Sequence, residues 1–313
     1  MKTLFNILRI LIALFLIFFL LRKVNLKMAL QILRQSLPTF IILAGISFFF
    51  FLLISNIRWK ILLDIKGLDF SSNYLLRIYF VSYFFNNILP TAIGGDVMRV
   101  TYTIKKDSGV GTPLSVVFID RVIGFLGLFF FALLASLVLL FLKLPGGRNY
   151  LVINLIGFFV ILGGIWAILA EAPYRLFRRL YLKLKFKGLG ERIDRFATTL
   201  RNFSTNLRPL FLSFLLSLLV QLTIAGTWYF SGLAIKKNIS PLYYFLYIPL
   251  IGLMTMIPIT LGGLGVRENA FVYFFKGVGL SCEEALGISL LFLLINYLYS
   301  LIGGLIFLFI KRR

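Results

Sequence analysis

Histidine is missing from this 313-residue sequence, and cysteine occurs only once, at Cys282. Without an imidazole group, the chain lacks the commonest metal ligand and general base of proteins. A single thiol cannot form an internal disulfide, and one thiol without histidine argues against a zinc or haem site. The sequence therefore predicts a protein that holds neither a metal nor another cofactor.

Charged residues are also scarce. They make up 14% of the chain, against roughly 25% in a typical soluble domain. Hydrophobic residues make up 60%, and the mean hydropathy is +0.97. Several apolar runs approach the ~20 residues that an α-helix needs to cross a bilayer. These features predict an all-α polytopic membrane protein with a single membrane domain over residues 1–313.

Acidic residues are the scarcest charged type, with 11 Asp and Glu against 33 Lys and Arg, so the net charge is +22. In a soluble protein this balance would suggest a nucleic-acid partner. Here the basic residues are spread over loops between apolar runs, so we predict no nucleic-acid partner. Basic loops are typical of the cytoplasmic side of a membrane. We predict a location in the cytoplasmic membrane of a prokaryote, with both termini in the cytoplasm.

Six apolar runs are predicted to be full transmembrane helices. They cover residues 4–21, 38–57, 114–142, 151–170, 209–234 and 284–310. Two further apolar regions, 74–104 and 242–276, are interrupted, and each is expected to form a re-entrant hairpin of two helical arms. Because residues 74–89 would be ~24 Å long as a helix, a structure with eight spans is an alternative.

The two interrupted regions share a sequence pattern. Residues 90–99 and 258–267 both read Pro-x3-Gly-Gly-x3-Arg, and the two copies lie 168 residues apart. The pattern divides the chain into a first half, 1–142, and a second half, 150–313. Because the first half has three crossings, the second half would enter the membrane from the opposite face. This arrangement is an inverted repeat, and broken helices at matching positions indicate a transporter binding site.

A basic loop, 171–208, is the only sizeable segment outside the apolar regions, and we place it in the cytoplasm. Its apolar residues recur at helical spacing. They are Ile193, Phe196, Ala197, Leu200, Phe203 and Leu207. This spacing predicts an amphipathic helix that lies on an anionic lipid surface. The alternative is a basic topology determinant with no other role.

Six charged residues lie in or beside the apolar regions. They are Asp96, Arg99, Asp120, Arg121, Arg267 and Glu268. An ionised side chain in the middle of a bilayer costs ~2.5–3.5 kcal/mol, so these residues need a reason to be there. One interpretation is mutual pairing that locks helices together. The other is a binding site, which better explains why four of the six lie at the two Gly-Gly breaks.

The binding-site interpretation uses the helix that begins after each break. Free backbone N–H groups and the positive end of the helix dipole attract anions there, and glycine lets a ligand approach the backbone. Arginine adds a bidentate donor that suits phosphate. The predicted lipid-headgroup site contains Arg99, Arg121, Arg267, Gly94, Gly95, Gly262 and Gly263.

The three acidic residues, Asp96, Asp120 and Glu268, are predicted to hold the arginines in place. Asp96 could instead be the N-cap of its own helix. Since Asp120 and Arg121 are adjacent, they point ~100° apart on a helix of 3.6 residues per turn, and each is expected to pair with a hairpin.

One face of the first arm is polar and aromatic. Its residues, at i, i+3, i+4, i+7 and i+8, are Tyr79, Ser82, Tyr83, Asn86 and Asn87. Such a face would be costly against lipid, so it is predicted to line a wet cavity or to contact the second hairpin.

Three segments, 89–99, 120–124 and 258–268, resemble the membrane region of lysylphosphatidylglycerol synthases, part of a wider flippase-like family. The resemblance covers nearly the whole chain. It implies a lipid translocator with a cavity between two re-entrant hairpins. In two-part members a soluble carboxyl-terminal domain makes the aminoacyl lipid. This sequence ends at Arg313 without such a domain, so we do not expect it to make lysyl-lipid.

The sequence contains no recognisable catalytic motif, so we predict no catalytic residues. We expect the protein to move a phosphate-bearing lipid, namely a phospholipid or a polyprenyl-phosphate lipid, between leaflets. The lipid could be anionic, aminoacylated or polyprenyl-linked. One alternative is a lipid-modifying transferase with Asp96 or Asp120 as base, and another is a membrane anchor for a lipid synthase. A homo-oligomer is compatible with the sequence.

Overall fold

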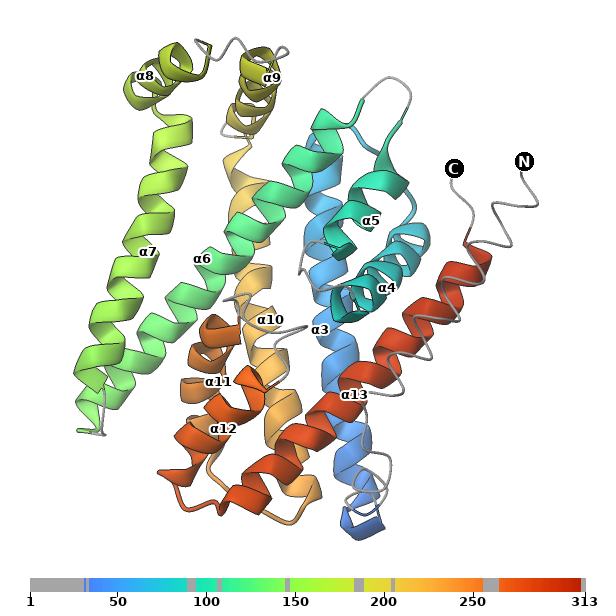
Figure 1. Ribbon diagram of the computed structural model, residues 1–313, viewed down its shortest axis with the longest axis vertical. Helices are drawn as coiled ribbons and strands as arrows, with labels where there is room; N and C mark the ends of the chain where they lie inside the picture. Colours follow the sequence, from blue (N-terminus) through green and yellow to red (C-terminus); the bar gives the residue numbers. More distant parts are fainter. Residues whose placement is uncertain are drawn as a thin grey trace. The chain divides into compact units, whose positions relative to one another are not determined.

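The computed structural model describes residues 31, 34–88, 94–105, 109–143, 147–182, 189–203, 206–255 and 265–310. The elements in these ranges are eleven α-helices (Figure 1). They are α3 (Pro38–Ile65), α4 (Ser72–Ile88), α5 (Gly94–Thr103), α6 (Gly111–Phe141), α7 (Gly147–Leu169), α8 (Glu171–Leu182), α9 (Leu189–Arg201), α10 (Leu207–Ala234), α11 (Pro241–Thr255), α12 (Val266–Lys276) and α13 (Cys282–Phe309).

Five of these helices, α3, α6, α7, α10 and α13, are long and apolar enough to cross a membrane. The helices of 28 residues, such as α3, would be ~42 Å long at ~1.5 Å per residue, which exceeds the ~30 Å hydrocarbon core. The five helices correspond to five of the six predicted spans. The sixth predicted span, 4–21, lies outside the described residues.

Each interrupted apolar region contains two shorter helices. Helices α4 and α5 form what we call the first broken pair, and helices α11 and α12 form the second. The breaks themselves, 89–93 and 256–264, lie outside the described residues. The two predicted arms of each region are therefore present, whereas their re-entrant course stays a prediction.

The chain divides into two compact units. Unit 1 contains Met1–Asn56, Ser71–Tyr102 and Leu219–Arg313, and unit 2 contains Ile57–Phe70 and Thr103–Leu218. Helices α3 and α10 contribute residues to both units. Each unit draws residues from both predicted halves of the chain, and the inverted repeat of 1–142 and 150–313 stays a prediction.

In unit 1, α13 packs closely along α4. A side chain at Gly303 of α13 would collide with the backbone of Phe80, so the glycine allows the two helices to approach, as small residues do between membrane helices. Farther along α13, the Phe292 ring stacks on Trp228 of α10 with the centroids 4.1 Å apart. Trp228 also stacks on Phe271 of α12 at 4.5 Å, so aromatic contacts join α10, α12 and α13.

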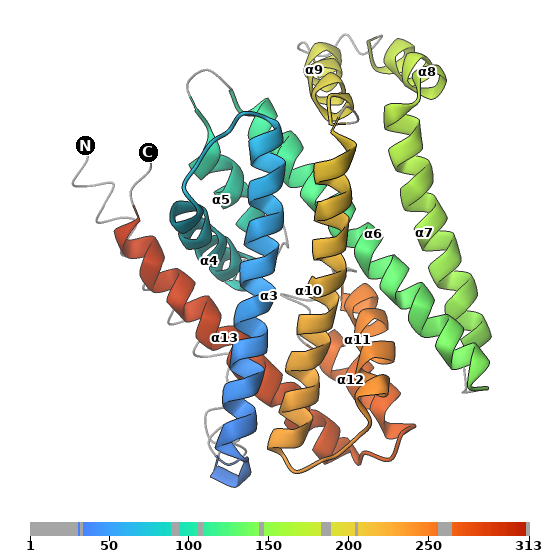
Figure 2. The ribbon, with the colours of Figure 1, turned by 180° about the vertical axis from the view of Figure 1, so that it is seen from behind.

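In unit 2, α6 and α7 lie side by side (Figures 1 and 2). Asn154 of α7 donates a hydrogen bond of 2.8 Å to Ser136 of α6 in the buried interface. Helices α8 and α9 also pack together, and Arg178 pairs with Asp194 at 2.9 Å between them.

The predicted amphipathic helix of the basic loop corresponds to α9. The structure ends α9 at Arg201, so Phe203 and Leu207 do not belong to this helix as the spacing predicted. Leu200 and Phe203 are nevertheless buried, and the Lys66 ammonium lies 4.0 Å from the centroid of the Phe203 ring.

Candidate functional site

The start of α5 lies tightly against α4 in unit 1. The Gly95 N–H donates a hydrogen bond of 2.8 Å to the Asn86 side-chain oxygen. A Cβ atom at Gly95 would lie 2.6 Å from Ser82 Oγ, closer than real Cβ atoms come to another heavy atom. Gly95 is therefore required by the close approach of the two helices. The neighbouring Gly94 is the first residue of α5.

Arg99 lies one turn into α5 and is buried, with 4% of its surface exposed. Its Nη1 atom lies 3.5 Å from Asp96 Oδ1. Its guanidinium carbon lies 5.4 Å from the centre of the Tyr79 ring on α4, within the range of a cation–π contact. Asp96 is inside the first turn of α5 rather than at its N-cap, because the helix begins two residues earlier, at Gly94.

The second broken pair presents a matching arrangement at the start of α12. Arg267 donates hydrogen bonds to Oε1 of the adjacent Glu268, with Nη2 at 2.8 Å and Nε at 3.2 Å. The other oxygen, Oε2, accepts the Gly265 N–H, which is one half of a capping box. Gly265 has φ +82°, a conformation that favours glycine. Glu268 thus fixes both the helix start and the arginine.

The polar face of α4 contacts the other helix of the first broken pair, α5. Tyr79 contacts Arg99, whereas Tyr83 lies within electrostatic range of Arg267. Asn87 donates a hydrogen bond of 3.1 Å to the Tyr83 carbonyl oxygen. These contacts explain why an otherwise apolar helix carries this face. Whether the face also lines a cavity stays a prediction.

Helix α13 packs against the same region of unit 1. The Phe292 ring lies 5.3 Å from the Arg267 guanidinium carbon, and Tyr297 lies within electrostatic range of both Arg267 and Glu268. The two broken pairs thus bring two guanidinium and two carboxylate groups into one unit. Each arginine pairs with a carboxylate of its own helix, so these pairs do not lock the two broken pairs together. Gly262 and Gly263 lie outside the described residues.

Unit 2 contains a second buried charge cluster. Arg58 Nε of α3 lies 2.7 Å from Asp120 Oδ1 of α6, and Arg58 Nη1 donates a hydrogen bond of 2.8 Å to Ser217 Oγ of α10. Arg58 is 7% exposed and Asp120 is 1% exposed. One turn beyond Asp120, a Cβ atom at Gly124 would lie 3.4 Å from the guanidinium nitrogens.

This cluster corrects the sequence prediction for Asp120, whose observed partner is on a span and not on a hairpin. Arg58 was missed because the predicted span ended at residue 57. The structure continues α3 to Ile65, and the apolar residues Trp59, Leu62 and Leu63 were the signal for it. Arg121 is half-buried and belongs to unit 2, so its predicted place beside Arg99 and Arg267 stays a prediction.

In the parts of the chain that the structure describes, no group of three or more His, Cys, Asp or Glu side chains is placed to hold a metal ion. The arrangement in unit 1 is suited instead to binding a small anion or a polar headgroup. Its arginines offer planar N–H donors, and each lies near the start of its own helix, where free backbone N–H groups also attract anions.

Comparison with known proteins gives a family and three archaeal relatives. The family model described as "Lysylphosphatidylglycerol synthase TM region" matches residues 6–304. A UPF0104 membrane protein of Methanothermobacter thermautotrophicus is 24% identical over 88% of this chain and 85% of its own length. One from Methanocaldococcus jannaschii is 28% identical over 74% of this chain and 95% of its own length.

A third UPF0104 membrane protein, from Pyrococcus horikoshii, is 26% identical over 95% of both chains. No solved structure shows a significant match. The relatives and the five span-length helices together identify a multi-pass membrane protein.

Proposed function

Because the chain belongs to the lysylphosphatidylglycerol synthase TM region family, we propose that it moves a phosphate-bearing lipid between the two leaflets of the membrane. One observation carries the proposal. Two arginines, Arg99 and Arg267, are held away from solvent near the starts of two short helices, α5 and α12, that begin after the two sequence breaks. A lipid headgroup that crosses the bilayer needs polar partners of this kind at membrane depth.

In this proposal the arginines bind the lipid phosphate, and the carboxylates orient the arginines. Glu268 engages Nε and Nη2 of Arg267, whereas Nη1 donates no hydrogen bond to a described residue. The Nη1 side of the Arg267 guanidinium group can therefore donate hydrogen bonds to a phosphate oxygen. At the first broken pair, Asp96 and Tyr79 hold Arg99.

The balance of charges at the site is compatible with several classes of lipid headgroup. Two arginines and two carboxylates give the region no net charge, so the headgroup need not be a simple anion. The arginines suit the phosphate, and Asp96 or Glu268 could accept a cationic group on an aminoacylated lipid. A polyprenyl-linked phosphate fits the same arginines. Access would alternate between the two broken pairs as halves of an inverted repeat.

An anchoring role is the second candidate. It is favoured by the family description, which names the membrane region of a synthase. In that role the membrane helices would hold a lipid synthase at the membrane surface. A lipid-modifying transferase receives less support, because its candidate bases, Asp96 and Asp120, are both ion-paired with an arginine.

Purified protein in proteoliposomes would separate these candidates. After incubation with phosphatidylglycerol and with a polyprenyl phosphate, the lipids would be analysed by mass spectrometry and by a membrane-impermeant headgroup reagent. Translocation predicts unchanged masses and a faster exchange of lipid between leaflets than in protein-free vesicles. New lipid masses would favour the transferase, and unchanged masses with unchanged sidedness would favour the anchor.

A further inference from the structure

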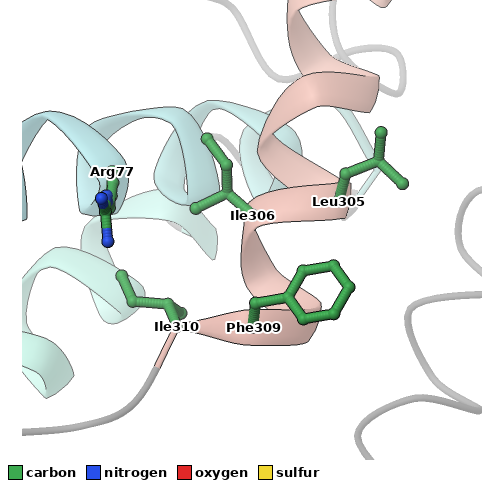
Figure 3. A pocket seen from close by; sticks show the side chains of 5 residues that line it. All are labelled: Arg77, Leu305, Ile306, Phe309 and Ile310. Carbon is green, nitrogen blue, oxygen red and sulfur yellow. The ribbon is translucent and has the colours of Figure 1, made fainter.

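A groove lies in unit 1 where the last turns of α13 pass α4 (Figure 3). Its volume is about 260 Å³. It is lined by Arg77, Leu305, Ile306, Phe309 and Ile310. Figure 3 shows Arg77 on α4 facing Ile306 of α13 and Ile310, the C-cap residue of that helix, with the Phe309 ring on the other side of the same turn. The groove thus combines one cation with apolar walls.

Arg77 differs from the three ion-paired arginines described above. Arg58, Arg99 and Arg267 each pair with a carboxylate. Arg77 is exposed, and within the described residues it forms no ion pair or hydrogen bond. Its guanidinium group therefore has planar donors available for a phosphate.

The walls of the groove are suited to hydrocarbon. Phe309 is 81% exposed and Leu305 is 54% exposed, and both belong to a helix that is long and apolar enough to cross a bilayer. The volume is below the ~300–1,000 Å³ of a typical small-molecule pocket. It therefore fits a phosphate with the upper part of an acyl chain better than it fits a whole soluble ligand.

The position of the groove agrees with a membrane interface. Ile310 is the C-cap residue directly after α13, and the sequence continues with Lys311-Arg312-Arg313. Basic residues directly after a span lie at the headgroup level of the cytoplasmic leaflet, where anionic lipids attract them. Arg77 lies beside this end of the span.

We propose that this groove binds an anionic phospholipid from the leaflet at the carboxyl-terminal end of α13. The phosphate contacts Arg77, and an acyl chain follows the surface formed by Leu305 and Phe309. This site is separate from Arg99 and Arg267 of the broken pairs, and it does not depend on translocation.

The test is titration of the detergent-purified protein with phosphatidylglycerol, with bound lipid counted by native mass spectrometry. Arg77→Ala removes the cation and is expected to weaken binding about fivefold, since one basic side chain near a membrane surface has about that effect. Arg77→Lys keeps the charge and should retain part of the affinity. Leu305→Trp fills the groove but leaves Arg77 intact, and it should also weaken binding.

The matched control is Arg148→Ala, which removes another exposed basic residue, at the start of α7 and outside the basic loop. It should leave this binding unchanged. Phosphatidylcholine should bind more weakly than phosphatidylglycerol, and inorganic phosphate should not displace the lipid, because it lacks the chain. Unchanged phosphatidylglycerol affinity in Arg77→Ala, an equal loss in Arg148→Ala, or displacement by inorganic phosphate would each overturn the proposal.

Discussion

The two buried arginines in the described residues, Arg58 and Arg99, are tolerated because each lies beside a carboxylate. Arg58 and Asp120 are the most buried pair, and Ser217 takes a further hydrogen bond from the same guanidinium. Removing one member of such a pair leaves a charge without its partner in a low-dielectric environment, which costs far more than the loss of an exposed pair. The same helix α3 also carries an exposed pair, Lys60 and Asp64.

These two pairs provide a matched comparison. Asp120→Asn is expected to lower the free energy of unfolding by about 3 to 5 kcal/mol, because Arg58 stays buried. Asp64→Asn should change it by no more than about 1 kcal/mol, because this pair is partly exposed to solvent. Denaturant titration in detergent measures both values. Equal effects of the two substitutions would contradict this account of Arg58.

From the sequence alone, Arg99, Arg267 and Glu268 could be chosen as candidate site residues, because a charged residue in an apolar run needs a structural or functional reason. The sequence was not sufficient to predict their partners. The Arg58–Asp120 pair joins residues that are 62 positions apart, and nothing local in the sequence predicts such a contact. The sequence analysis could have placed Arg58 in a helix only by extending the predicted span past residue 57, as the structure does.

At the scale of elements, the candidate site depends on how two short helices, α5 and α12, begin. Glu268 has two functions at the start of α12, since one oxygen accepts the Gly265 N–H and the other pairs with Arg267. Glu268→Gln keeps a hydrogen-bond acceptor for the cap but removes the ion pair. Glu268→Ala removes both.

We therefore expect Glu268→Ala to be less stable than Glu268→Gln by about 1 kcal/mol, the usual contribution of a cap. Both variants should translocate lipid more slowly than the wild type, since both release Arg267. Unfolding titrations and transport assays on the two variants provide the measurement. If the two variants have the same stability, the second oxygen of Glu268 has no capping function.

The contact between α4 and α5 depends on Gly95, and this dependence can be tested against another helical glycine. Gly95→Ala adds a methyl group against Ser82 and Asn86, and overpacking of this kind costs about 1 to 3 kcal/mol. Gly164→Ala in α7 adds the same group where nothing lies within 4 Å, so stability should fall by less than about 0.5 kcal/mol. Thermal unfolding in detergent compares the two, and equal melting temperatures would exclude a tight approach at Gly95.

The sequence predicted the existence of the elements better than their ends. Proline and paired glycine divided each interrupted region, and the structure contains a helix on each side of both breaks. The predicted amphipathic helix was too long, since apolar spacing continues past Arg201 although α9 ends there. Periodicity cannot show where one helix stops when the next, α10, continues the pattern.

At the scale of the whole molecule, orientation in the membrane is the main prediction still to be tested. The chain has a single cysteine, Cys282, which is exposed at the start of α13. Because α13 is long enough to span the bilayer, Cys282 and residue 313 should lie on opposite sides. We expect Cys282 outside and the carboxyl terminus in the cytoplasm.

A membrane-impermeant maleimide applied to intact cells should therefore label wild-type Cys282. It should label the double variant Cys282→Ser, Arg313→Cys only after the cells are opened. The reverse pattern would invert the predicted topology, and labelling of both positions from outside would show that α13 does not cross the membrane.

The central claim is that Arg99 and Arg267 carry a lipid headgroup through the membrane. The most direct measurement is the rate of headgroup translocation in proteoliposomes for the wild type, Arg99→Ala, Arg267→Ala and the control Arg208→Ala. A charged hydrogen bond contributes about 1.5 to 3 kcal/mol, so each of the first two variants should be about 10- to 100-fold slower, whereas Arg208→Ala should match the wild type. Undiminished translocation in both Arg99→Ala and Arg267→Ala would contradict the account.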